Sequence, residues 1–145
     1  YYFVSNADFD AMIEENKLLE WAFVHGNRYG VPVSSVSTRL KNGEDVICVI
    51  DVQGALKIRS MFSESLLVFL RPPLGREAEV LKERIQNRGA EDDGQIAKRL
   101  ETASWELTQT SLYDYELVNE HVEETAQQLC EIVAREKAKR LGIRG

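Results

Sequence analysis

Cysteine and histidine are scarce in this sequence, which has two of each. Two cysteines, Cys48 and Cys130, are too few for a disulfide framework, and their apolar neighbours predict buried, reduced thiols in a cytoplasmic protein. The two histidines form no cluster with cysteine, so the sequence predicts no metal cage. No apolar run approaches the ~20 residues of a membrane helix, and no signal-peptide pattern opens the chain, so no membrane partner is expected.

Positive charge is also in deficit. The formal net charge is -6 and the pI is about 5.0, whereas broad binding to nucleic acid needs clustered Lys and Arg facing many phosphates. Nucleic acid is therefore not an expected partner, and any phosphate site must be local. The 145 residues are 43% hydrophobic and 29% charged. This length and composition are typical of one globular domain with a hydrophobic core.

Helical and strand-like patterns alternate along the chain, which predicts an α/β fold with parallel strands. A hairpin is expected around the turn-forming pair Gly26-Asn27. The continuous apolar runs "VICVID", "LLVFLR" and "YELVN" predict buried parallel strands at 46–51, 66–71 and 115–119. Helices are expected at 6–16 with Asn6 as N-cap, 34–43 ending at Gly43, 52–62, 76–89, 92–110 and 121–140.

Three arginines on the predicted helical hairpin are candidates for a phosphate site. Arg84 and Arg88 are four residues apart on one helix face, and Arg99 lies on the returning helix. Guanidinium groups suit phosphate oxygens because their donor fork is fixed and always charged. The same arginines could instead be solvated i to i+4 partners of the glutamates nearby, and spacing alone leaves both interpretations open.

Carboxylate and phenol groups lie close together in "EWAFVHGNRYG", residues 20–30. A carboxylate such as Glu20 can accept two parallel hydrogen bonds from the N1–H and 2-amino groups of guanine, a donor pair that adenine lacks. Tyr1 and Tyr29 could donate hydrogen bonds to a phosphate. Taken alone, Glu20 could equally be a solvated loop residue, and either tyrosine could cover the core.

The order of seven motifs resolves these alternatives. "YYFVS", "LLEWAFVHGNRYG", "NGEDVICVIDVQGA", "LRPP", "RIQNRG", "IAKRLETASWEL" and "YDYELVN" together resemble the guanylate kinase family in order and approximate spacing, over essentially the whole chain. The resemblance implies a P-loop nucleoside-monophosphate-kinase-like fold, with a parallel-sheet core, a small mostly β GMP-binding region and a helical lid. It also implies phosphorylation of GMP to GDP by ATP with Mg²⁺.

The resemblance assigns roles to five residues near GMP. Tyr1 and Tyr29 match tyrosines that hydrogen-bond the GMP phosphate, and Glu20 matches the carboxylate that reads guanine. Gly30 would let the backbone pass close to the ligand. Asp51 matches the strand end that carries polar groups toward the substrate and metal region.

On the lid, Arg88 and Arg99 match the arginines that neutralise the transferring phosphoryl group and contact ATP, with Arg84 as a helper. Two positions depart from the family pattern. Val31 stands where Ser or Thr is usual, and Val49 stands where an acidic residue is usual, so Glu20 would carry more of the guanine discrimination. The segment at 72–89 is about three residues longer than usual.

A P-loop, G-x-x-x-x-G-K-[ST], does not occur, because none of the nine glycines is followed by lysine. The family keeps this loop and a first strand before the position of Tyr1, and the chain does not begin with Met, so we expect the 145 residues alone to be inactive. Two alternatives remain: an inactive kinase-like module that binds a protein or phosphopeptide, and a kinase for AMP or UMP. The expected regions are GMP binding at 1–33, core at 34–73, lid and returning helix at 74–110, and C-terminal core at 111–145.

Overall fold

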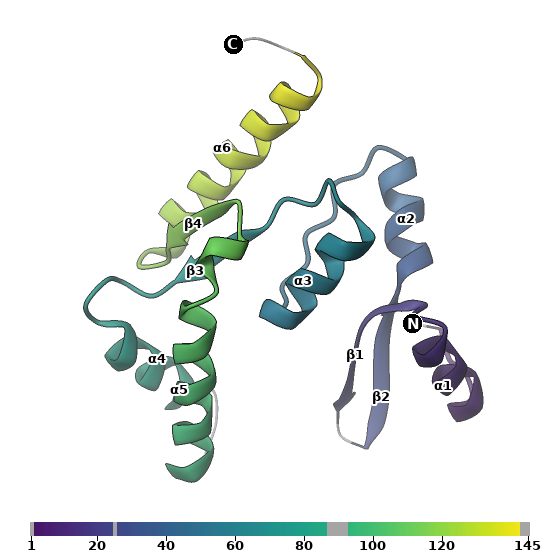
Figure 1. Ribbon diagram of the computed structural model, residues 1–145, viewed down its shortest axis with the longest axis horizontal. Helices are drawn as coiled ribbons and strands as arrows, with labels where there is room; N and C mark the ends of the chain where they lie inside the picture. The colour runs from purple at the N-terminus through teal and green to yellow at the C-terminus, as the bar shows by residue number, and fades with distance from the viewer. Residues whose placement is uncertain (1, 25, 87–92, 143–145) are drawn as a thin grey trace. The chain divides into compact units, whose positions relative to one another are not determined.

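The computed structural model describes residues 2–24, 26–86 and 93–142, without the side chains of residues 24, 84–86, 93–96 and 99. It divides into two parts, residues 1–65 and 66–145, and each part is described by itself. The first part contains helix α1, the antiparallel strands β1 and β2, and helices α2 and α3 (Figure 1). Their bounds are α1 Asn6–Glu14, β1 Leu18–Val24, β2 Asn27–Pro32, α2 Val33–Lys41 and α3 Val52–Met61.

A small apolar core joins the hairpin to two helices. Leu19 of β1, Val36 of α2 and Ile58 of α3 are buried together in this cluster. Burial of each such side chain stabilises the fold by about 1.5–3 kcal/mol. Lys57 on α3 adds a polar tie, because its Nζ donates a hydrogen bond to the backbone oxygen of Leu18 at 2.8 Å. The base of the hairpin is therefore fixed against α3.

The second part is built around a short parallel strand pair. β3 and β4 lie side by side (Figure 1), with Val68 opposite Tyr115 and Arg71 opposite Val118. The Leu67 backbone N–H donates to the Asp114 carboxylate at 2.8 Å, which sets the start of the pairing. The elements are β3 Val68–Arg71, α4 Glu77–Gln86, α5 Asp93–Leu107, the 3₁₀ helix η1 Thr110–Leu112, β4 Tyr115–Val118 and α6 Val122–Arg140.

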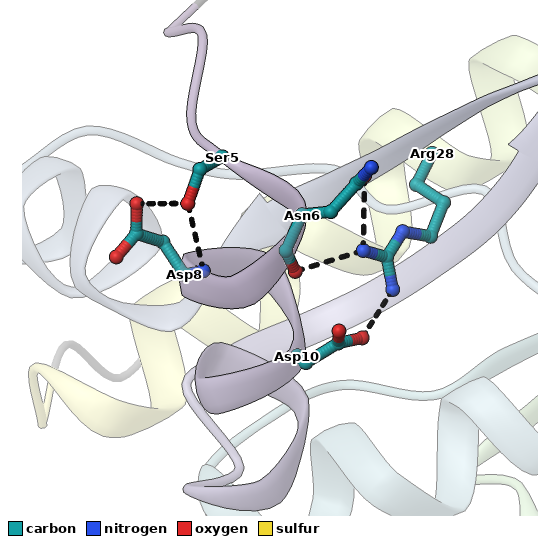
Figure 2. A network of polar contacts seen from close by, with 5 residues as sticks. All are labelled: Ser5, Asn6, Asp8, Asp10 and Arg28. Carbon is teal, nitrogen blue, oxygen red and sulfur yellow. Dashed lines mark hydrogen bonds and ion pairs between the residues drawn. The ribbon is translucent and has the colours of Figure 1, made fainter.

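Most predicted elements are confirmed, with described end points that differ by a few residues, while the predicted helix ends at 87–89 and 92 lie outside the described residues. The hairpin, the helix after Asp51, the parallel pairing of 66–71 with 115–119 and the three later helices all occur. The helix at 34–43 also ends as predicted, since Gly43 follows the C-cap residue with φ +79°. Asn6 is not the N-cap of α1. Ser5 takes that place, and its Oγ accepts from the Asp8 backbone N–H at 3.1 Å (Figure 2).

The predicted strand at 46–51 is wrong. The segment has no regular secondary structure, and Ile47 and Val49 are 76% and 94% exposed. A strand needs a neighbour for its backbone N–H and C=O groups, and no strand in the described part of the chain pairs with this run. An apolar, β-branched composition favours a strand but supplies no partner.

The prediction of buried cysteines is also wrong, because Cys48 and Cys130 are both exposed, although both are free thiols. Cys48 lies in the segment that forms no strand. Cys130 lies on α6, whose covered side includes the buried residues Thr125 and Ile132. Position 130 is five residues after the first and two before the second, so it falls off that stripe.

Candidate functional site

The register of the hairpin brings the predicted guanine and phosphate contacts to one face. Glu20 pairs with Val31 and Ala22 pairs with Tyr29. Opposite residues of an antiparallel pair project to the same face, as do residues two apart on one strand. Glu20, Ala22, Tyr29 and Val31 therefore share one side of the sheet, which we call the pocket face. Glu20 is exposed and Tyr29 is 45% exposed, so both can reach a ligand.

Gly30 lies between Tyr29 and Val31, and the structure gives it a packing role. A Cβ at this position would lie 3.0 Å from Leu18 Cδ1, 3.2 Å from Leu18 Cδ2 and 3.2 Å from the Glu20 backbone oxygen. Leu18 is only 2% exposed and is the largest fully buried side chain among the described residues. The space left by the missing side chain of Gly30 is therefore filled by Leu18.

Asp51 begins helix α3 as its N-cap. Its Oδ1 accepts a hydrogen bond from the Gly54 backbone N–H at 2.8 Å, which satisfies a donor at the helix start. A Cβ on Gly54 would lie 3.3 Å from that oxygen and 3.1 Å from Ile50 Cβ. The small residue in "DVQG" thus leaves room for the cap, and the exposed Asp51 carboxylate retains a second oxygen.

The Cys48 thiol feels the negative charge of Glu20. Partial burial raises the pKa of the Cys48 thiol, and the negative charge of Glu20 raises it further. Cys48 lies in the segment between α2 and α3. Val31, directly opposite Glu20, is 44% exposed and adds an apolar surface beside the carboxylate.

Helices α4 and α5 carry two of the predicted lid arginines on their backbones, Arg84 and Arg99. Their side chains, and all of Arg88 and Tyr1, lie outside the described residues. What the structure does describe is the base of α4. Arg71, at the end of β3, pairs with Glu77 at 3.0 Å and also with Glu116 of β4.

The Arg71 ion pairs connect the first turn of α4 to both strands of the parallel pair. Glu77 is in that first turn, where the helix dipole favours a carboxylate. A hydrogen bond from its own backbone N–H lowers the pKa of Glu77, and the Arg71 guanidinium lowers it further, while partial burial acts in the opposite direction. The start of the predicted lid is thereby fixed to the strand ends.

Neither Arg28 nor Arg71 was predicted from the sequence to have a role. Arg28 is next to Tyr29, and its contacts lie 18 and 22 residues away on α1, so no local pattern shows them. Arg71 is not three or four residues away from Glu77 or Glu116, so helical spacing does not reveal these ion pairs. The signal available for it was its place at the end of an apolar strand, followed six residues later by Glu77.

The described residues hold neither a membrane-spanning helix nor a cluster of metal ligands. None of the helices resolved there is long and apolar enough to cross a membrane. Within the same ranges, no three His, Cys, Asp or Glu side chains are grouped so that they could hold a metal ion.

Comparison with known proteins places this chain in a family. The family model described as guanylate kinase matches residues 1–136. The chain belongs to the guanylate kinase family. Among curated relatives, the guanylate kinase of Prochlorococcus marinus is 44% identical over 92% of this chain and 71% of its own length. The guanylate kinase of Bacillus subtilis is 44% identical over 97% of this chain and 67% of its own length.

A solved guanylate kinase has the same fold. The crystal structure of guanylate kinase from Anaplasma phagocytophilum matches with a TM-score of 0.64 and 33% identity, covering 94% of this chain and 64% of that one. The family and the P-loop kinase-like α/β fold class are therefore confirmed. This member of the guanylate kinase family spans about two thirds of the length of the relatives it matches. Guanylate kinases take GMP and ATP as substrates, which favours a phosphotransferase over an inactive binding module.

Proposed function

We propose that this guanylate kinase family member transfers the γ-phosphoryl group of ATP to GMP. A phosphate oxygen of GMP attacks the γ-phosphorus, the bond to the β–γ bridging oxygen breaks, and GDP and ADP result. The observation that carries the proposal is the register of β1 and β2, which puts Glu20 and Tyr29 on one exposed face. A carboxylate that binds the base and a phenol that donates a hydrogen bond to the phosphate, both on one surface, fit one nucleoside monophosphate.

Glu20 supplies the discrimination between purines in this proposal. Its two carboxylate oxygens accept from guanine N1–H and the 2-amino group, and the charge makes both hydrogen bonds strong. Adenine presents an acceptor at N1 and no 2-amino group, so it would leave the carboxylate unpaired. This argument weighs against AMP as substrate, and UMP likewise lacks the donor pair.

Phosphoryl transfer depends on positioned positive charge more than on covalent chemistry by the protein. Arg88 and Arg99, with Arg84 as a helper, are proposed to supply it from the helical lid at 74–110. Tyr1 and Tyr29 are proposed to hold the GMP phosphate, Gly30 to adjoin it, and Asp51 to face the substrate and metal region. Mg²⁺ would be bound with ATP through the substrate phosphates and would neutralise part of their charge.

The functional regions follow the same proposal. Residues 1–33 bind GMP, 34–73 and 111–145 belong to the core, and 74–110 form the lid with its returning helix. We also propose a cytoplasmic location, which the free thiols Cys48 and Cys130 support because reducing compartments keep such thiols unpaired.

The test is nucleotide choice in the natural full-length protein. Calorimetry should show tighter binding of GMP than of AMP, and Glu20→Gln should lower GMP affinity by roughly tenfold to a hundredfold, the loss expected for a charge-assisted contact worth ~1.5–3 kcal/mol. Glu44→Gln is the matched control, because Glu44 is an exposed carboxylate paired with Arg39 of α2. Equal affinity for AMP and GMP, or full GMP selectivity in Glu20→Gln, would refute the assignment.

A further inference from the structure

Arg28 sits on β2 immediately before Tyr29, but it belongs to the opposite face of the hairpin. It pairs with Phe23, while Tyr29 pairs with Ala22. Neighbouring residues of a strand project to opposite sides, so Arg28 faces away from the pocket face. Its side chain is only 17% exposed, which is low for an arginine near a hairpin turn.

Helix α1 accounts for this burial (Figure 2). Arg28 Nη2 donates hydrogen bonds to the backbone oxygen of Asn6 at 2.9 Å and to Asn6 Oδ1 at 3.1 Å. Arg28 Nη1 forms an ion pair with Asp10. Asn6 and Asp10 are four residues apart, so they lie on one face of the helix. Both terminal nitrogens of the guanidinium are thus used to join β2 to α1.

Phe9 extends the connection to the other strand. The Arg28 guanidinium carbon lies 4.7 Å from the centre of the Phe9 ring, which is a cation–π geometry. Phe9 is 7% exposed and meets Trp21 edge to face, with ring centres 6.3 Å apart. Trp21 directly follows Glu20 on β1. We call Asn6, Phe9, Asp10 and Arg28 the Arg28 network.

We infer that Arg28 is a positioning residue for the GMP pocket. Arg28 directly precedes Tyr29 and binds α1. Through the Phe9 ring it is also connected to Trp21, which directly follows Glu20. Because side chains alternate along each strand, fixing one face of the hairpin fixes the direction of the side chains on the other. This inference rests on the proposed function, since it assigns Arg28 the task of holding Glu20 and Tyr29 in the geometry that GMP requires.

The experiment uses the natural full-length protein and two measurements. The first is amide hydrogen exchange of β1 and β2 without nucleotide, and the second is GMP affinity by calorimetry. The variants are Arg28→Ala, Arg28→Lys, Tyr29→Phe and the double variant Arg28→Ala with Tyr29→Phe. Arg39→Ala is the matched control, because Arg39 also pairs with a carboxylate in the first part of the chain but lies on α2 and is 64% exposed.

Arg28→Ala should speed exchange of the hairpin amides and lower GMP affinity roughly tenfold, a size usual for coupling between neighbouring residues. Arg28→Lys should recover part of both, because an ammonium keeps the Asp10 pair and loses the planar fork that also reaches Asn6. Arg39→Ala should change neither. In the Tyr29→Phe background, Arg28→Ala should cost less affinity, since one of the two contacts that Arg28 positions is already gone and only that of Glu20 remains. A residue that only stabilises the fold would cost the same in both backgrounds.

Unchanged hairpin exchange in Arg28→Ala, or an equal fold-loss of affinity in both backgrounds, overturns the inference. If the unmodified protein binds no GMP, the proposed function fails, and the exchange measurement alone then upholds or overturns the positioning of the hairpin by Arg28. Asp10→Asn keeps the size of the side chain and removes the ion pair. It gives the same comparisons if Arg28→Ala does not fold.

Discussion

Replacing Gly30 with alanine measures how closely the two strands of the hairpin are packed. The new Cβ would lie 3.0 Å and 3.2 Å from the two methyl carbons of Leu18 and 3.2 Å from the Glu20 backbone oxygen. Leu18 is 2% exposed, so it would have to shift by a few tenths of an ångström within packed surroundings. Overpacking of this kind costs about 1–3 kcal/mol. Alanine also restricts the unfolded chain, which stabilises by about 0.4–1 kcal/mol.

The two effects oppose one another, and the steric one is larger. We expect Gly30→Ala to lower the free energy of unfolding by about 1–2 kcal/mol, measured as a lower urea midpoint with an unchanged slope. Leu18→Ala is itself expected to cost about 2–5 kcal/mol. In that background the methyl groups are absent, so adding Gly30→Ala should be close to neutral.

Two results would refute this reasoning. One is a Gly30→Ala protein that is more stable than the unmodified one. The other is an equal loss in both backgrounds within ~0.5 kcal/mol, which would show that Leu18 and position 30 are independent. A large loss of GMP affinity without any loss of stability would instead support the ligand-approach role that the family resemblance implies for this glycine.

Three further predictions concern the lid, the pH dependence and the phosphate loop. Arg99→Ala should lower kcat far more than it raises the KM for GMP if, as proposed, its charge stabilises the phosphoryl group during transfer; steady-state kinetics with an unchanged kcat would contradict this. Ionised Glu77 stabilises the fold above the usual carboxyl pKa, and this contribution disappears as the pH falls through its lowered folded pKa. The difference in unfolding free energy between the unmodified protein and Glu77→Gln should therefore be constant near neutral pH and shrink below pH 4.5 in acid titrations followed by circular dichroism. A polypeptide of these 145 residues alone should not phosphorylate GMP with ATP and Mg²⁺ in a coupled assay, since no P-loop lysine or N–H cradle holds the β- and γ-phosphates; turnover at a normal kinase rate would require another phosphate site.

Local signals allowed much of the fold to be predicted. Gly26-Asn27 marks the hairpin because a turn between two strands needs a residue at positive φ, and Gly26 has φ +80°. The pocket-face residues Glu20 and Tyr29 follow from that hairpin once its register is known. The N-cap was misplaced by one residue because Ser5 and Asn6 are both good caps, and only the hydrogen bond to Asp8 distinguishes them.

Contacts between distant residues account for what could not be predicted. The run 46–51 has the composition of a strand, yet pairing depends on a neighbour that its own residues do not encode. The sequence around Arg28 indicates only a polar residue in a hairpin. Its role depends on Asn6 and Asp10, which precede it by 22 and 18 residues. Cys130 was expected inside because of its apolar neighbours, but the buried stripe of α6 runs past it.

The two ends of the hairpin differ in exposure, and this difference has a consequence for protein engineering. Leu18 and Leu19 are adjacent and both buried, at 2% and 3% exposure, so the hairpin is covered at its base. At the other end Phe23 is 67% exposed, and nothing approaches within 4 Å of where a Gly26 Cβ would be. A peptide tag or fluorescent reporter inserted at Gly26 would lengthen the hairpin away from its anchored end. The turn is thus an insertion point that leaves Glu20 in place as long as the contacts of Arg28 with α1 are kept.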